Sequence, residues 1–169
     1  FDSDGALNYY TARSIDSDGA KKYINSKVKR KDIIFNEINI RWKEPLVLVE
    51  GPFDLMKCNW NATAMLGSYL DESYLLFQKI VKNQTDVILA MDTDAIEKRI
   101  KIAQKLKSYG INVKYLDFND IACDINNEKC EILTKSNSKI YVDANGHLSF
   151  DGARYFSDKM KQKNWLQLN

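Results

Sequence analysis

Short apolar runs alternate with amphipathic segments between Pro45 and Asp120, and this alternation restricts the possible folds most strongly. The runs expected as strands are 46–49, 62–66, 87–91 and 113–116, and the segments expected as helices are 53–60, 71–82 and 95–109. Such an alternation is typical of a mostly parallel sheet that helices cover on both faces. We therefore predict an α/β fold. The last helix should end at Gly110 and bury Ile96, Ile100, Ala103 and Leu106.

A smaller strand-rich lobe is expected before this sheet. Residues 6–15 are rich in strand formers, and two copies of Asp-Ser-Asp-Gly, at 2–5 and 16–19, bracket them as turns. Beyond Asp120 the pattern predicts an irregular polar stretch over 123–137, a hairpin over 139–150 and a helix over 152–163. The predicted domains are 1–44, 45–120 and 121–169, the last without an assigned role.

Composition narrows the classes of protein further. The 169 residues are 44% hydrophobic with a net charge of +2, which suits a folded domain but does not by itself indicate a polyanionic partner. No apolar run approaches the roughly 20 residues that cross a bilayer, so we expect a soluble, intracellular protein with no membrane partner. The odd set Cys58, Cys123 and Cys130 lacks a C-x-x-C pair, which predicts reduced cysteines and no zinc in this segment.

Acidic residues follow three of the predicted strands. Glu50 ends the first strand with Asp54 one turn beyond it, Asp92 and Asp94 follow the third, and Asp117 and Asp120 follow the fourth. In an open parallel sheet, ligands bind beyond the carboxyl ends of the strands. Carboxylates gathered there repel one another and need a positive partner, and all-oxygen ligation favours Mg²⁺ or Mn²⁺. Each acid alone has the alternative role of a turn former or helix cap, as Asp94 has for the helix from 95.

The stretches Glu50-Gly-Pro-Phe-Asp54, Ala64-Met-Leu-Gly67 and Val87-Ile-Leu-Ala-Met-Asp92-Thr-Asp94 resemble the TOPRIM domain. Bacterial-type primases, type IA and II topoisomerases, and some nucleases and recombination proteins share that domain. The upstream Arg13, Asp16-Ser-Asp-Gly19 and Lys22-Tyr-Ile-Asn-Ser26 resemble the strand-rich lobe that precedes TOPRIM in bacterial and phage primases. The wording Glu-Gly-Pro-x-Asp is closest to T-even-type phage primases.

The resemblance implies a TOPRIM-like DNA primase catalytic core that makes short RNA primers on single-stranded DNA by metal-dependent nucleotidyl transfer. Its substrates would be ribonucleoside triphosphates, its cofactor Mg²⁺ or Mn²⁺, and its partner a replicative helicase. The implied catalytic metal ligands are Glu50, Asp92 and Asp94, supported by Asp54 and by Asp117 or Asp120.

The same lobe is expected to bind nucleotide or template. The resemblance assigns this role to Arg13, Lys22 and Asn25, and the basic run containing Lys27, Lys29 and Arg30 would add contacts to a nucleic-acid backbone. Tyr9, Tyr10 and Tyr23 either stack on bases or pack within the sheet, and packing is the favoured interpretation.

Two departures from the family pattern leave choices open. Ile96 stands where Asp-x-Asp is usually followed by Ala-Gly, and Asn119 stands where many primases carry a second Asp. The second departure leaves open whether Asp117 or Asp120 faces the metal. Separately, Glu50 has two alternative roles, as a metal ligand or in proton transfer. The alternatives to a primase are a TOPRIM-type metal-dependent nuclease and a non-catalytic recombination mediator that binds nucleic acid.

Overall fold

The protein folds into two compact units, Phe1–Tyr115 and Leu116–Asn169. The computed structural model describes residues 1–15, 23–56, 58, 61–91, 95–115, 119–124, 127–142 and 148–162, without the side chains of 119 and 120. Within this part of the chain no helix is both long and apolar enough to span a bilayer.

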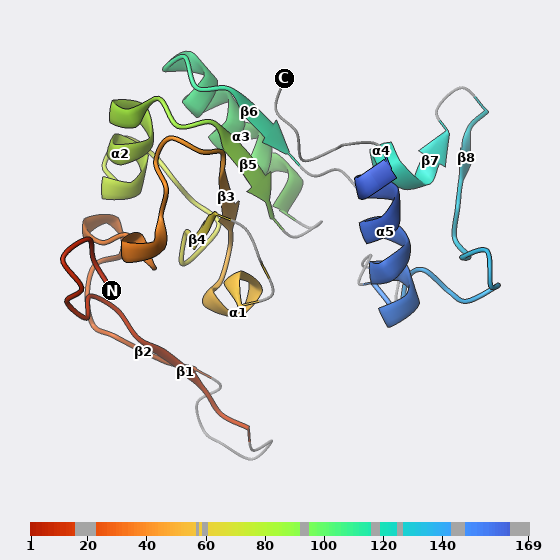
Figure 1. Cartoon of the computed structure of the whole chain (residues 1–169), viewed down its shortest axis with the longest axis horizontal. Helices are drawn as coiled ribbons and strands as arrows, with labels where there is room; N and C mark the ends of the chain where they lie inside the picture. Colours follow the sequence, from red (N-terminus) through yellow and green to blue (C-terminus); the bar gives the residue numbers. More distant parts are fainter. Residues whose placement is uncertain are drawn as a thin grey trace. The chain divides into compact units, whose positions relative to one another are not determined.

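The first unit confirms the predicted α/β fold, in which a small strand-rich lobe precedes a parallel sheet in the sequence (Figure 1). The lobe contains β1 (Thr11–Arg13), β2 (Tyr23–Asn25) and two 3-10 helices, η1 (Arg30–Asp32) and η2 (Glu37–Asn39). The elements that follow are β3 (Leu46–Val49), α1 (Pro52–Leu55), β4 (Ala62–Ala64), α2 (Leu75–Asn83), β5 (Val87–Ala90), α3 (Ile96–Ser108) and β6 (Val113–Tyr115). The four parallel strands lie in the order β4-β3-β5-β6, and β1 pairs antiparallel with β2.

One face of the sheet packs against α2 and α3. Leu48 of β3 and Leu89 of β5 lie opposite each other and share a core with Phe77 and Ile80 of α2 and Leu106 of α3. Their neighbours along the strands point to the other face and are buried as well. Burial on both faces explains why these strands are continuous apolar runs.

The buried face of α3 differs from the predicted one. Ala103 and Leu106 are buried as expected, but Ile96 and Ile100 are exposed, and Arg99 is buried together with Ile102. The Arg99 guanidinium lies over the Tyr115 ring, 5.1 Å from its centroid. Apolar periodicity misled the prediction because a long cationic side chain can cover a ring as an apolar one does.

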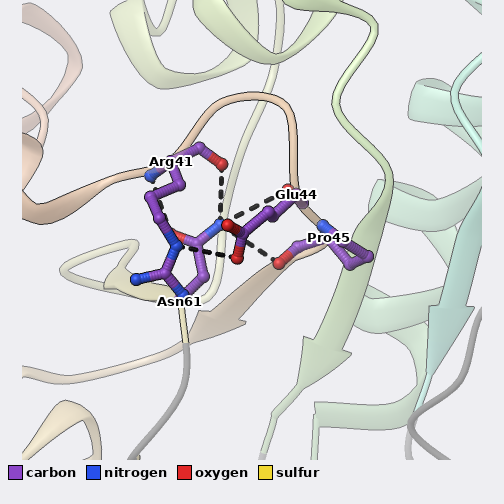
Figure 2. A network of polar contacts seen from close by, with 4 residues as sticks. All are labelled: Arg41, Glu44, Pro45 and Asn61. Carbon is purple, nitrogen blue, oxygen red and sulfur yellow. Dashed lines mark hydrogen bonds and ion pairs between the residues drawn. The ribbon is translucent and has the colours of Figure 1, made fainter.

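The segment before β3 is tied to the start of β4 by Asn61, whose side chain is buried (Figure 2). Its Nδ2 donates to the carbonyls of Arg41 at 2.8 Å, Pro45 at 3.1 Å and Glu44 at 3.3 Å, and its Oδ1 accepts from Arg41 N–H at 2.9 Å. Because one buried amide satisfies several backbone groups, this network fixes the amino edge of the sheet.

The helix predicted over 71–82 begins later, at Leu75. The Asp71 side chain accepts hydrogen bonds from the N–H and hydroxyl of Ser73, which forms a turn there and lowers the pKa of Asp71. Beside this turn, Lys105 Nζ lies 2.8 Å from Glu72 Oε1. That hydrogen bond lowers the pKa of Glu72 and raises the pKa of Lys105.

Other predicted boundaries shift by a few residues. The helix expected over 53–60 is the single turn α1, with residues 57, 59 and 60 outside the described residues, and the strand expected over 62–66 ends at Ala64. Of residues 6–15, only Thr11–Arg13 form a strand. These three residues pair with Tyr23–Asn25 of β2. The turn at 2–5 is present, with Gly5 N–H donating to the Asp2 carbonyl at 3.2 Å, and the turn at 16–19 lies outside the described residues. Gly110 ends α3 as predicted, at φ +79°.

The second unit contains α4 (Asn119–Ala122), β7 (Cys123–Asp124), β8 (Lys129–Cys130) and α5 (Phe150–Gln162). Its small core contains Ile121, Ala122, Ile140 and Phe156. Gly152 of α5 touches the backbone at Ile140 so closely that a Cβ there would lie 2.0 Å from the carbonyl oxygen. The helix predicted from 152 is thus present from Phe150, and the turn of the predicted 139–150 hairpin lies outside the described residues.

The expectation of reduced cysteines is wrong for two of them. The antiparallel pairing of β7 with β8 places Cys123 directly opposite Cys130, and the two form a disulfide. The stretch predicted as irregular therefore contains a short, cross-linked strand pair. Sequence spacing missed it because a disulfide depends on side chains that meet in space, whereas Cys58 is a free thiol.

Candidate functional site

The candidate site lies at the carboxyl edge of β3 and β5. Strand order β4-β3-β5-β6 means that the chain leaves β3 toward one side of the sheet and leaves β5 toward the other. Ligands of open α/β sheets bind at such a switch point. The register pairs Val49 with Ala90, so the two strands end side by side, about 5 Å apart.

Glu50 is the first residue beyond this edge on β3, and it is half-buried. Its backbone carbonyl accepts the Gly67 N–H at 3.1 Å, which joins the exits of β3 and β4. Four other residues predicted for the site lie outside the described residues or lack described side chains: Asp92, Asp94, Asp117 and Asp120. In the sequence, Asp92 and Asp94 come two and four residues after Ala90, the residue that pairs with Val49 directly before Glu50.

Asp54 stabilises the turn that follows Glu50. Its Oδ2 accepts the Gly51 N–H at 3.2 Å at the beginning of α1, and its side chain is exposed. A Cβ at residue 51 would lie 3.1 Å from that oxygen, so glycine allows the close turn. One of the two Asp54 carboxylate oxygens thus has a structural role. The role of Asp54 as a metal ligand stays a prediction.

The loop after β4 has an unusual backbone. Leu66 has φ +61° and Gly67 has φ +156°, both in regions that side-chain-bearing residues avoid. A Cβ on residue 67 would lie 3.1 Å from Nη1 of Arg30, so the guanidinium packs against the glycine backbone. Arg30, predicted to bind nucleotide or template, is thereby placed beside the residue that bonds to Glu50.

Sequence reasoning missed a second cation at this loop. Lys98, in the first turn of α3, donates a hydrogen bond to the Ser68 hydroxyl at 2.9 Å. The signal available was Leu66-Gly67-Ser68 directly after a strand, but the partner of that loop could not be read from the sequence. Arg30 and Lys98 thus bring positive charge to Gly67 and Ser68 at the carboxyl edge.

The other predicted binding residues lie on or next to the β1–β2 ribbon. Arg13 places its guanidinium 5.5 Å from the centre of the Tyr23 ring, and Asn25 accepts the Thr11 hydroxyl at 2.7 Å. Lys27 and Lys29 are exposed, as is Arg30. Lys22 lies outside the described residues.

A divalent metal is compatible with the donors at this edge, because the predicted set contains carboxylates alone and hard cations bind oxygen. Only Glu50 and Asp54 of that set have described side chains. Among side chains that the structure describes, no three His, Cys, Asp or Glu residues come together as a metal site. The metal centre therefore stays a prediction from the sequence.

Comparison with known proteins gives one informative likeness. No protein-family model matches the chain, and no solved structure matches it. The chain is 30% identical over 125 residues to the DNA primase of Mycoplasma pneumoniae (strain M129), a match that covers 67% of this chain and 20% of that protein. This chain is thus similar to a DNA primase of which it spans about a fifth of the length.

Proposed function

We propose that this chain is the catalytic core of a DNA primase, which joins ribonucleotides into short primers on single-stranded DNA. The observation that carries the proposal is the β3–β5 register, which brings Glu50 beside the strand exit that leads to Asp92 and Asp94. The likeness to a DNA primase supports the same reaction class.

The reaction suits an acidic edge that has cations beside it. The 3′ hydroxyl loses its proton, its oxygen bonds to the α-phosphorus of the incoming nucleotide, and pyrophosphate leaves. Glu50, Asp92 and Asp94 would hold Mg²⁺ or Mn²⁺, which when bound lowers the pKa of the hydroxyl and neutralises the triphosphate. Asp54, with Asp117 or Asp120, would support this set.

Arg30 and Lys98 supply the complementary part of the site. Both reach the loop at Gly67 and Ser68, beside the Glu50 carbonyl, where a triphosphate or template phosphate would need positive charge. Arg13 and Asn25 on the ribbon, together with Lys22, Lys27 and Lys29, would extend phosphate contacts along the strand. A replicative helicase would deliver the template.

Primer synthesis on single-stranded DNA, with labelled ribonucleotides and Mg²⁺ or Mn²⁺, tests the proposal. Glu50→Gln and Asp92→Asn should each lose product by at least about a hundredfold, since each removes a charge from the reacting edge. Asp86→Asn is the matched control, because Asp86 precedes the same β5 strand at its amino end and should leave synthesis unchanged.

Binding of Mn²⁺ gives a readout that does not depend on turnover. It is measured by electron paramagnetic resonance, as the decrease in the signal of the unbound ion. The wild-type chain and Asp86→Asn should bind the ion, and Glu50→Gln should bind it more weakly. If all variants make equal amounts of primer, the assignment of Glu50 and Asp92 to the catalytic site is wrong. Nicking of plasmid DNA without primer synthesis would favour the nuclease, and DNA binding indifferent to Mg²⁺ without any product would favour the recombination mediator.

A further inference from the structure

An aromatic pocket lies between the strand-rich lobe and α1. Its volume is about 420 Å³, within the range of small-ligand sites. The main lining residues are Tyr9, Tyr10, Phe35, Pro52, Phe53 and Met56. Pro52 and Phe53 follow Glu50 by two and three residues, so the pocket adjoins the acidic edge of the sheet.

The rings of this pocket divide into a packed wall and an exposed one. Tyr9 is 7% exposed, and its ring meets the Phe35 ring edge-on at 5.9 Å, as in an ordinary core contact. Tyr10 and Met56 are 53% and 80% exposed although both line the pocket. Large apolar side chains that stay exposed around a hollow are typical of a binding site.

Two cations are linked to residues that line the pocket. The Phe53 ring lies 5.9 Å from the Tyr23 ring, and the Arg13 guanidinium lies over that same Tyr23 ring. Tyr10 N–H donates to the Ser26 hydroxyl, and the Tyr10 carbonyl accepts the Ser26 N–H at 3.0 Å. Lys27, the next residue in the chain, is exposed. An aromatic pocket with cations close to its lining complements a base that is linked to phosphates.

We propose that this pocket receives one unpaired base of a single-stranded nucleic acid, stacked against Tyr10, while Arg13 and Lys27 contact the flanking phosphates. This rests on the proposed function, because it deepens how the same carboxyl edge holds its template.

The polar side chains of Thr11 and Asn36, which line the pocket, already have partners within the protein. The Thr11 hydroxyl donates to Asn25 Oδ1 at 2.7 Å. Asn36 Nδ2 donates to the Ala62 carbonyl at 3.4 Å, and Asn36 Oδ1 accepts from Asn39 at 2.6 Å. With the Thr11 hydroxyl and the Asn36 amide engaged, recognition rests mainly on stacking, so the pocket should accept all bases similarly.

Oligonucleotide binding by the full chain, without nucleotides and without divalent metal, tests the pocket separately from synthesis. The probe is fluorescein-labelled oligothymidylate of about 12 nucleotides, followed by anisotropy. Tyr10→Leu should weaken binding by about fivefold or more, because a leucine keeps the apolar bulk and loses the ring. Tyr10→Phe should bind as the wild type does, and oligocytidylate should bind within about twofold of oligothymidylate.

Tyr109→Leu is the matched control. Tyr109 is 43% exposed at the end of α3, at the amino edge of the sheet, and its loss should leave binding unchanged. An oligonucleotide carrying one 5-iododeoxyuridine, irradiated on the protein, should cross-link within residues 9–11 or 52–56.

Several outcomes overturn the inference. Wild-type affinity in Tyr10→Leu, or cross-links confined to other segments, would remove the pocket. If ATP alone displaces the oligonucleotide, with the same dependence on Tyr10, the ligand of the pocket is a free nucleotide and not a single-stranded nucleic acid. Binding that depends on Tyr10 in a chain that makes no primers would keep the pocket and remove the proposed synthesis. If the wild-type chain makes primers and Tyr10→Leu binds the oligonucleotide normally, only the proposed role of the pocket is wrong and the proposed function stands.

Discussion

Gly67→Ala tests whether the loop after β4 positions Arg30 beside the acidic edge. Gly67 combines a φ of +156° with a guanidinium 3.1 Å from the place that a Cβ would occupy. Its N–H also donates to the Glu50 carbonyl. An added methyl group should therefore strain the backbone, push the Arg30 side chain away, and disturb the exit of β3.

The magnitude follows from these two terms. Backbone in this region costs a residue with a Cβ about 1–3 kcal/mol. The contact with Arg30 adds little, because a long side chain can retreat by a few tenths of an ångström. Since about 1 kcal/mol shifts the melting temperature of a domain this size by about 2–4 °C, Gly67→Ala should lower it by several degrees.

Gly110→Ala is the matched control for this variant. Gly110 has a positive φ of +79°, and a Cβ there would meet Gln84 Oε1 at an ordinary 3.8 Å. Its substitution should cost about 1 kcal/mol and leave the carboxyl edge intact. Thermal unfolding and primer synthesis are measured on both variants, and only Gly67→Ala should lose synthesis beyond its loss of stability. If Gly67→Ala is as stable and as active as wild type, the packing of Arg30 on the glycine has no functional consequence.

Three further predictions concern stability. Gly152→Ala should destabilise by about 2–4 kcal/mol in thermal unfolding, because the new methyl group would overlap a backbone carbonyl; the exposed Ser157→Ala is its control, and a stabilised Gly152→Ala, the usual result in a helix, would show that the two backbones do not touch. Asn61→Ala should cost about 2–4 kcal/mol in urea unfolding, since it strands several buried backbone groups, and a loss below about 0.5 kcal/mol would mean that water replaces the amide. The lowered pKa of Glu72 stabilises the folded state above the unfolded value of about 4.3, so the advantage of wild type over Lys105→Met should disappear in urea titrations as the pH falls below that value; an advantage that persists at low pH would point to packing instead of charge.

The architecture followed from local patterns. Apolar runs such as Leu46–Val49 can be strands only if both faces are buried, and the amphipathic segments between them supply the cover. Gly110 ended α3 as predicted because the left-handed conformation of a helix end is a local property. The placement of Glu50 at a strand end was equally local.

Features that depend on a partner distant in the sequence escaped prediction. Arg99 of α3 is buried over the ring of Tyr115 from β6, whereas its charge alone predicted exposure. Cys123 and Cys130 are bonded because two short strands pair in one register. The shift of α2 to Leu75 has a local cause instead, because the Asp71 side chain forms a competing turn with Ser73.

The sequence by itself determined the order of strands and helices and the residues that follow each strand, because periodicity and turn chemistry act over a few residues. Only the tertiary structure decided that β3 and β5 end together, that Arg30 reaches Gly67, and that Tyr9 and Tyr10, which precede β1, line a pocket together with Phe53 of α1. These relations depend on strand order and on packing between distant segments, which local patterns do not encode.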